Sequence, residues 1–251
     1  MDLQEKVDLQ SKRHPWEKVR AKFIQKILLE FAPDSFRVLD VGCGDGYIAS
    51  RLAENFSHTE YIGLDTNLTS AQLDFYNTKN PQVKFTKNNK YLAEKQFDLV
   101  LLLDVLEHIE DDEKFIMQIV SKYLAKKSRM LITVPAFPFL YGSHDSIMGH
   151  YRRYTQNQLK NMAQNANCKT IATGYMFASL VPMRAISILL QRLSLIKKPD
   201  YSGVGQWNGS NLFSKLIEYA LTIDNQILFS ASKSGYLIPG LSLWLLCEKR
   251  Q

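Results

Sequence analysis

The sequence predicts an α/β protein built on a doubly wound, mostly parallel sheet. Up to about residue 135, short apolar runs alternate with segments whose apolar side chains recur at helical spacing. The run over residues 97–103 is almost wholly apolar, as expected of a central strand that is covered on both faces. Ligands of such sheets bind outside the carboxyl ends of the strands, so the chemistry is expected there.

The first half of the chain is expected to supply strands and helices in alternation. Strands are predicted where apolar and β-branched residues form short runs that end at glycine, acidic or polar residues. These runs cover residues 36–41, 61–64, 83–86, 97–103 and 130–134. Helices are predicted over residues 16–31, 45–55, 68–76 and 111–124. The last of these carries acidic residues in its first turn, where the helix dipole favours them.

The alternation changes after the fifth strand. A helix over 156–166 and a sixth strand over 170–175 are followed by about fifty residues, 177–228, that are apolar and helical in pattern. A last apolar strand is expected over residues 241–247. The long helical stretch is therefore predicted to be inserted before the last strand.

Composition and charge limit the class of protein. The chain is 45% hydrophobic and 22% charged, which is ordinary for a soluble globular protein. Its three cysteines are far apart and form neither a disulfide framework nor a metal-ligand spacing, so we expect a cytoplasmic protein without a metal. The net charge of +6 fits either an anionic partner or a solvated basic surface.

A glycine-rich loop follows the first predicted strand. Gly42, Gly44 and Gly46 allow a tight turn and a close approach of a ligand to the backbone. A dinucleotide site has the spacing G-x-G-x-x-G, whereas here the third glycine comes one residue early. Asp40 at the end of the strand would repel a pyrophosphate and attract an ammonium group. A plain tight turn is the alternative interpretation.

A second carboxylate ends the second predicted strand. Asp65 lies about twenty residues past the glycines, where an acid can accept hydrogen bonds from both hydroxyls of a ribose. The alternative is that Asp65 caps the helix that follows.

Four segments in this order resemble the class I S-adenosylmethionine-dependent methyltransferases. They are VLDVGCGDG at 38–46, IGLD at 62–65, FDLV at 97–100 and DVLEHI at 104–109. The resemblance implies a Rossmann-like, seven-stranded sheet whose last strand is antiparallel. It also implies S-adenosylmethionine as the cofactor, with S-adenosylhomocysteine as its product.

The resemblance assigns cofactor-binding positions. Asp40 and the glycines resemble the methionine pocket, Asp65 the acid on the ribose, and Asn88 a polar group near the adenine amine, where many members have Asp. The full set of expected cofactor residues is Asp40, Gly42, Cys43, Gly44, Gly46, Asp65, Thr66, Asn88, Leu103 and Asp104.

The long loop over 135–154 is expected to meet the acceptor, because long loops at strand ends are usually functional. Similar loops, together with a His-Pro-Trp-Glu start like residues 14–17, occur in bacterial small-molecule methyltransferases. Histidine is the usual general base for a hydroxyl nucleophile, so the candidate catalytic residues are His108, His144 and His150. The candidate substrate-binding residues are Trp16, Arg20, Tyr141, Arg152, Arg153 and Tyr154. Alternatively, Asp145 pairs with an arginine and the aromatic residues only pack.

These inferences divide a single domain of 1–251 into four parts. They are a lid helix (1–31), a cofactor-binding core (32–176), a helical substrate cover (177–235) and a final strand (236–251). The cover is expected to line a pocket for an apolar or lipid-linked acceptor or to contact the inner face of a membrane, and core packing or a dimer face is the alternative.

The favoured function is methylation, preferably O-methylation, of a small-molecule acceptor that is anionic or lipid-linked. A nucleic-acid methyltransferase is an alternative because the pI is about 9.1. The polar-Pro-Pro-aromatic motif of enzymes that methylate base amino groups is replaced by Asp-Val-Leu-Glu at 104–107, which argues against nucleic acid. A non-catalytic module that binds S-adenosylmethionine is the other alternative, and the intact glycine and acid set argues against it.

Overall fold

A computed structural model describes residues 13–32, 37–55, 60–92, 95–196 and 207–250. The expected parts that fall on residues 1–12, 36, 197–206 and 251 lie outside this description.

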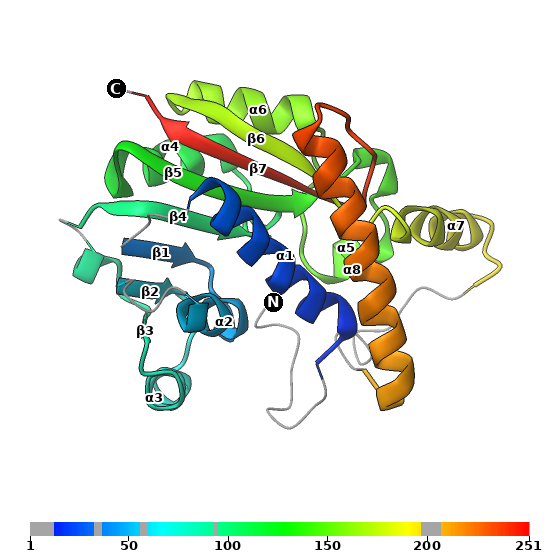
Figure 1. Ribbon diagram of the computed structural model, residues 1–251, viewed down its shortest axis with the longest axis horizontal. Helices are drawn as coiled ribbons and strands as arrows, with labels where there is room; N and C mark the ends of the chain where they lie inside the picture. The colour runs from blue at the N-terminus through cyan, green and yellow to red at the C-terminus, as the bar shows by residue number, and fades with distance from the viewer. Residues whose placement is uncertain (1–12, 33–36, 56–59, 93–94, 197–206, 251) are drawn as a thin grey trace.

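The chain forms a seven-stranded sheet in the order β3-β2-β1-β4-β5-β7-β6 (Figure 1). The strands are β1 (Arg37–Val41), β2 (Glu60–Leu64), β3 (Val83–Thr86), β4 (Phe97–Leu103), β5 (Leu124–Pro135), β6 (Cys168–Met176) and β7 (Ser242–Lys249). The first five are parallel, and β7 runs antiparallel between β5 and β6. The predicted Rossmann-like fold class is confirmed, including the antiparallel last strand.

Helices cover both faces of the sheet. They are α1 (Pro15–Phe31), α2 (Tyr47–Asn55), α3 (Ser70–Lys79), α4 (Asp112–Tyr123), α5 (Ser143–Ile147), α6 (Gln156–Asn165), α7 (Leu180–Arg192) and α8 (Asn211–Lys233), with 3-10 turns at η1 (Asn89–Leu92), η2 (Leu106–His108) and η3 (Pro138–Leu140). One buried cluster joins the sheet to α4 and α6, and another joins it to α1, α2 and α8. The fold is therefore doubly wound, with a core on each side of the sheet.

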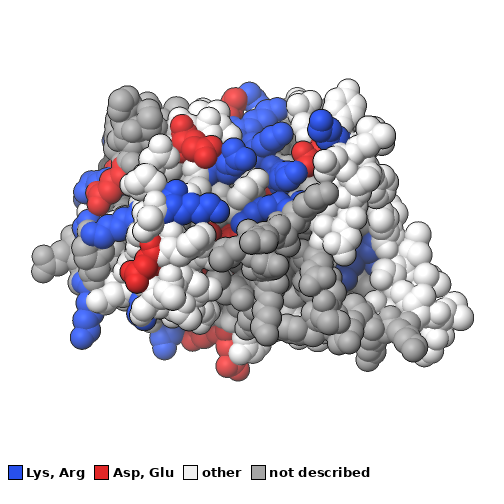
Figure 2. Space-filling model, turned by 90° about the horizontal axis from the view of Figure 1, so that it is seen from below, with Lys and Arg blue, Asp and Glu red and all other residues white. Residues whose placement is uncertain are grey.

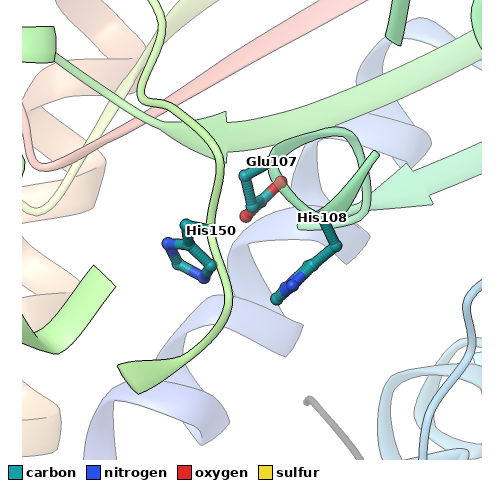
Figure 3. Close-up of side chains that lie close together, drawn as sticks. All are labelled: Glu107, His108 and His150. Atoms are coloured by element: carbon teal, nitrogen blue, oxygen red, sulfur yellow. The ribbon is translucent and has the colours of Figure 1, made fainter. Parts of the chain in front are cut away.

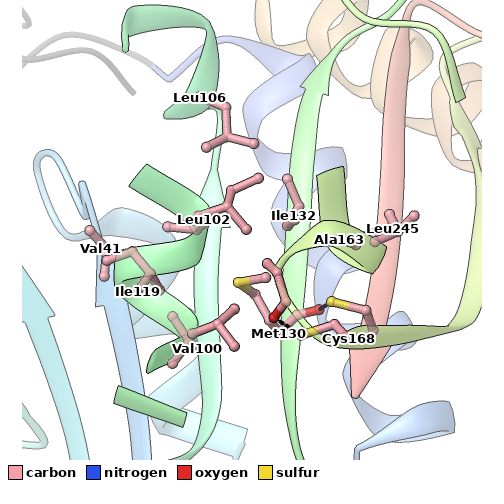
Figure 4. Close-up of a cluster of buried hydrophobic side chains, with 14 of the residues drawn as sticks. Val41, Val100, Leu102, Leu106, Ile119, Met130, Ile132, Ala163, Cys168 and Leu245 are labelled. Atoms are coloured by element: carbon pink, nitrogen blue, oxygen red, sulfur yellow. Dashed lines mark hydrogen bonds between the residues drawn. The ribbon is translucent and has the colours of Figure 1, made fainter. Parts of the chain in front are cut away.

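The burial of strand β4 explains why the run over residues 97–103 is almost wholly apolar. Val100 and Leu102 point into the core under α4 and α6 (Figure 4), whereas Leu99 and Leu101 belong to the opposite core. Successive side chains of a strand point to opposite faces, so a strand covered on both sides needs apolar residues at every position. Each such leucine contributes about 1.5–3 kcal/mol when fully buried.

Two elements differ from the prediction. β5 begins at Leu124, well before residue 130, because Leu124 pairs with Phe97 of β4, and regular pairing resumes at Arg129 after an irregularity in the register. Lys126 and Lys127 in this irregular part of β5 are exposed, so the start of the strand has no apolar pattern from which it could be predicted. The short helix α5 lies in the predicted loop, and its start is held by the Asp145 carboxylate, which accepts from the Gly142 amide at 2.8 Å.

The inserted helices α7 and α8 lie between β6 and β7 as predicted. Many apolar side chains of this insertion are exposed, among them Met183, Ile186, Leu189, Leu212, Leu216 and Tyr219. Figure 2 shows a surface with few charges on the side of α7 and α8, while Lys and Arg gather elsewhere on that face. Across the described ranges, the helices are too short or too polar to cross a bilayer.

Candidate functional site

A cavity of about 620 Å³ opens at the carboxyl ends of β1, β2, β4 and β5. The final or near-final residues of these strands line it, namely Val41, Leu64, Leu103 and Pro135. Its volume lies in the usual range of ligand pockets, about 300–1,000 Å³. The cavity therefore sits where the predicted fold places a ligand.

The glycine loop between β1 and α2 is packed too closely for side chains. Gly42 and Gly46 both have φ of +72°, which favours glycine. A Cβ on Gly42 would lie 2.7 Å from a methyl carbon of Val105, and one on Gly46 would lie 2.4 Å from the Phe85 ring. Side chains at these two positions would therefore collide with the protein itself, and of the two glycines only Gly42 lines the cavity.

Asp65 holds this loop in place. One of its carboxylate oxygens accepts a hydrogen bond from the Gly44 amide at 3.0 Å, and the other accepts from the Asn67 amide at 2.9 Å. Helix α3 begins at Ser70 and is capped by Thr69, so Asp65 does not cap that helix. Asp65 lines the cavity next to Thr66, and its contact with a ribose stays a prediction.

Asp40 is a buried carboxylate with an incomplete set of partners. The Tyr61 hydroxyl donates to one oxygen at 3.2 Å, while the other oxygen has no hydrogen-bond partner among the described residues. Burial raises the pKa of Asp40 to about 7, although the hydrogen bond from Tyr61 works against that rise. A carboxylate in this condition fits a cationic ligand group such as the ammonium of a methionine moiety.

Asp104 follows β4 in a left-handed conformation with φ of 57°. Its carboxylate accepts from the Thr133 hydroxyl at 2.8 Å and pairs with the Arg20 guanidinium at 2.9 Å. Arg20 also donates to Thr133 at 3.0 Å. Arg20 lines the cavity, and its contacts with Asp104 and Thr133 join α1 to the ends of β4 and β5.

Asn88, the residue expected near the adenine amine, is not among the lining residues of the cavity. The Asn88 side chain accepts from the Lys90 amide at 2.9 Å and does not line the cavity. Asn89, at the start of η1, lines it instead. The turn after β3 is a 3-10 turn, and the sequence pattern contained no signal for its register.

The three candidate catalytic histidines all line the cavity, beside Glu107 and Tyr151. The rings of His108 and His150 lie edge to face with centroids 4.7 Å apart. His144 is half-buried, and burial together with the nearby Arg184 lowers its pKa. His144 therefore stays neutral near pH 7 and can accept a proton.

Asp145 organises the rest of the loop over 135–154. Its fully buried carboxylate pairs with Arg153 at 2.8 Å and with Arg184 of α7, and it accepts from the Gly142 amide. The His150 ring lies 3.2 Å from the same group. Burial alone would raise the pKa of Asp145, but hydrogen bonds from His150 and Arg153 outweigh it and hold the pKa well below its usual range.

Four predicted substrate-binding residues do not line the cavity, because their polar groups have partners inside the protein. Arg153 binds Asp145, and the Tyr141 hydroxyl donates to the His150 carbonyl oxygen at 2.7 Å. Arg152 and the Tyr154 hydroxyl both contact Asp112. Asp145 thus pairs with an arginine, as the alternative interpretation held, and substrate binding by these four residues stays a prediction. Of the predicted substrate-binding set, Trp16 and Arg20 line the cavity.

No described residue of 177–235 lines the cavity, and the expected role of this segment as a substrate cover stays a prediction. Helix α7 supports the loop that contains α5, where Ser143 bonds Gln191 at 2.7 Å. Helix α8 packs on α1 and β6, with an ion pair between Lys18 and Glu218 at 2.7 Å. The described residues of the insertion therefore contact elements that line the site and are not themselves among the lining residues.

Several lining residues were not predicted. Glu107 lies beside the predicted His108, and Asn67 lies two positions after Asp65, so both could have been found as neighbours of motif residues. Tyr151 and Met148 line the cavity because the loop turns at Gly149, and periodicity cannot show such a turn.

The family described as "Methyltransferase domain" matches residues 15–173 of this chain. "Ubiquinone biosynthesis O-methyltransferase" from Rickettsia bellii is 32% identical over 100 residues, which cover 39% of this chain and 41% of the relative. The matched part thus spans less than half the length of such Rickettsia relatives.

Two solved structures show the same fold. A putative sarcosine dimethylglycine methyltransferase from Galdieria sulphuraria matches with a TM-score of 0.57 and 15% identity, covering 94% of this chain and 86% of that one. The 1,6-didemethyltoxoflavin-N1-methyltransferase of Burkholderia thailandensis, solved with S-adenosylhomocysteine, matches with a TM-score of 0.54 and 15% identity. That match covers 94% of this chain and 81% of the other.

Proposed function

This chain belongs to the class I S-adenosylmethionine-dependent methyltransferases, and from that premise we propose that it methylates a hydroxyl oxygen of a small-molecule acceptor. The observation that carries the proposal is the lining of the cavity. Gly42, Asp65 and Asp104, which are expected to meet the cofactor, line the same cavity as three histidines. A cofactor held by the first group would share one cavity with the imidazoles.

The glycine loop and the two acids suit the cofactor. Asp65 is fixed by two backbone amides, so its carboxylate is held in place for the ribose hydroxyls. Asp40 lacks a partner for one oxygen, which suits the ammonium group. Bound S-adenosylmethionine supplies an activated methyl group, so the protein has only to align the acceptor, take up its proton and exclude water.

His144 is the proposed general base. Its lowered pKa keeps the imidazole neutral, so that a ring nitrogen can accept the hydroxyl proton while the oxygen attacks the methyl carbon. The name of the Rickettsia relative, an O-methyltransferase, supports an oxygen acceptor. The N1-methyltransferase with the same fold shows that the fold alone does not choose the atom.

The test is turnover with paired acceptors. Formation of S-adenosylhomocysteine is measured with phenols and with anilines of matched shape, and we expect turnover with the phenols. H144Q should lower kcat by about 10²–10⁴-fold with little change in cofactor affinity. Turnover confined to amines, or an unchanged kcat in H144Q, would overturn the proposal.

A lipid-linked acceptor and contact with a membrane stay predictions for the exposed apolar side chains of α7 and α8. Co-sedimentation with anionic and with neutral vesicles checks them. Met183→Ser with Leu216→Ser should abolish co-sedimentation if these helices bind the lipid surface. If the parent protein does not co-sediment with either kind of vesicle, membrane contact by these helices is ruled out.

A further inference from the structure

Glu107, His108 and His150 form a cluster that lines the cavity. One ligand-type atom from each side chain lies within 4.8 Å of the other two. Figure 3 shows the Glu107 carboxylate facing the space between the two imidazole rings. His108 and Glu107 come from η2, and His150 comes from the loop after α5, so two segments distant in sequence build one cluster.

A backbone hydrogen bond fixes this juxtaposition. The Tyr151 amide donates to the Glu107 carbonyl oxygen at 2.7 Å and joins the two segments at the cluster. The three side chains therefore start from an anchored backbone, which is what a binding site for a small ion requires.

Glu107 itself points to a missing positive partner. Its side chain is 1% exposed, and its Oε2 atom has no hydrogen-bond partner in the described structure. The nearest guanidinium groups are already paired, Arg20 with Asp104 and Arg153 with Asp145. A buried carboxylate in this condition is normally paired or bound to a metal.

His150 is held as metal-binding histidines usually are. Its Nδ1 atom lies 3.2 Å from the Asp145 carboxylate. When Nδ1 donates to this carboxylate, Nε2 is left with a lone pair. Such a carboxylate–histidine pair is the common outer shell of metal sites, because it fixes the tautomer and the ring.

From these observations we propose that Glu107, His108 and His150 bind a divalent first-row transition metal, with Zn²⁺ as the best fit. Two imidazoles and one carboxylate suit such metals and leave positions open toward the cavity, whereas Mg²⁺ and Ca²⁺ prefer oxygen ligands. Bonds of about 2.0–2.2 Å would draw the three side chains closer together than they lie in the cluster.

The role of this metal rests on the proposed function. A metal ion at the cluster would bind the acceptor oxygen and stabilise its deprotonated form, while the proton passes to His144. The oxygen then bonds to the methyl carbon, and the electron pair of the broken carbon–sulfur bond stays on sulfur. The metal is neither oxidised nor reduced, and it suits acceptors with two adjacent oxygens that can bind it together.

The test titrates the chelator-treated full chain with Zn²⁺ by calorimetry, with and without S-adenosylhomocysteine. We expect one equivalent to bind, with much weaker binding of Mg²⁺ and Ca²⁺. E107Q and H150N should each lower Zn²⁺ affinity at least about tenfold, since even outer-shell changes cost about 10–100-fold. H144N is the matched control, because it removes a cavity histidine outside the cluster and should leave Zn²⁺ affinity unchanged.

S-adenosylhomocysteine affinity and near-UV circular dichroism report whether each variant folds, and H108N replaces any variant that does not. Zn²⁺ binding that is absent, or equal in the parent, E107Q and H150N, would overturn the metal site. Turnover of phenols that survives chelation, with no bound metal, would also overturn it and leave the proposed function standing. Stoichiometric Zn²⁺ binding without turnover of any hydroxyl acceptor would remove the proposed function alone.

Discussion

Two loops beside the cavity, the glycine loop and the loop over 135–154, treat buried charge in opposite ways. At the glycine loop, Asp40 keeps a buried oxygen without a partner, and Asp65 accepts only backbone amides. In the loop over 135–154, Asp145 is surrounded by Arg153, Arg184 and His150. The difference teaches that a charged residue near a site indicates a ligand only when its own partners are missing. Like Asp40, Glu107 has a buried carboxylate oxygen without a partner among the described residues, although Glu107 lies beside the loop over 135–154.

The largest expected effect concerns Asp145, whose buried carboxylate is paired with two arginines. D145N leaves two nearly buried guanidinium groups without their counter-ion, and breaking a buried pair this way costs about 3–5 kcal/mol of unfolding free energy. Urea denaturation of the apoprotein measures it. R152A is the control, because Arg152 is more exposed and surface pairs contribute about 0–1 kcal/mol. Equal losses in both variants would show that Asp145 is no special organising centre.

The next largest effect concerns Asp40, whose second carboxylate oxygen lacks a partner among the described residues. D40N should lower affinity for S-adenosylhomocysteine about 10- to 100-fold near neutral pH, because a hydrogen bond to a charged group contributes about 1.5–3 kcal/mol. Unfolding free energy of the apoprotein should stay the same or rise, since the mutation removes a poorly paired buried carboxylate. Calorimetry and urea denaturation give the two values. A large loss of stability with unchanged affinity would make Asp40 a structural residue.

The pH dependence of binding sharpens the same contrast. Burial raises the pKa of Asp40 to about 7 in the free protein, and a bound ammonium group would lower it again. Affinity for S-adenosylhomocysteine should therefore be full above about pH 7 and fall as the pH drops through 7, by up to about tenfold per pH unit. Calorimetry from about pH 6 to pH 8 measures the slope. D40N should flatten it, and a parent slope that persists in D40N would assign the titration to another group.

The apoprotein should show the opposite trend in stability. Because the folded pKa of Asp40 is above its unfolded value, this group's contribution is fully present at low pH. It is lost as the pH rises from about 4 to about 7. The difference between parent and D40N in urea denaturation isolates it, and a difference that does not vary with pH would contradict the raised pKa.

The smallest expected effect separates close packing from backbone conformation. Gly46 and Gly149 share a φ of +72°, but a Cβ would meet the Phe85 ring only at Gly46 and nothing within 4 Å at Gly149. G46A and G149A both carry the left-handed strain of about 1–2 kcal/mol, so their difference measures the clash, about 1 kcal/mol or more. Thermal denaturation compares them. Equal losses of stability in the two variants would show that the Phe85 ring moves aside at no cost in free energy.

The sequence predicted the fold and the kind of cofactor well because local chemistry decides both. The apolar run over 97–103 and the glycines after β1 carry their structural meaning in themselves. The acceptor site was harder, because Arg152 and Arg153 look like anion-binding residues until their contacts with Asp112 and Asp145 are known. The expectation that there is no metal followed from cysteine spacing, and no spacing rule joins Glu107 to His150 across two loops.

The position of β7 has a consequence for how the protein is made. This strand pairs with both β5 and β6, yet it is synthesised after both of them and after the inserted helices. Until β7 leaves the ribosome, β5 and β6 each present an unpaired edge with backbone groups that attract other strands. The nascent chain therefore passes through a stage in which its first strands have folded but its sheet is open. That interval is when the protein most needs protection from aggregation.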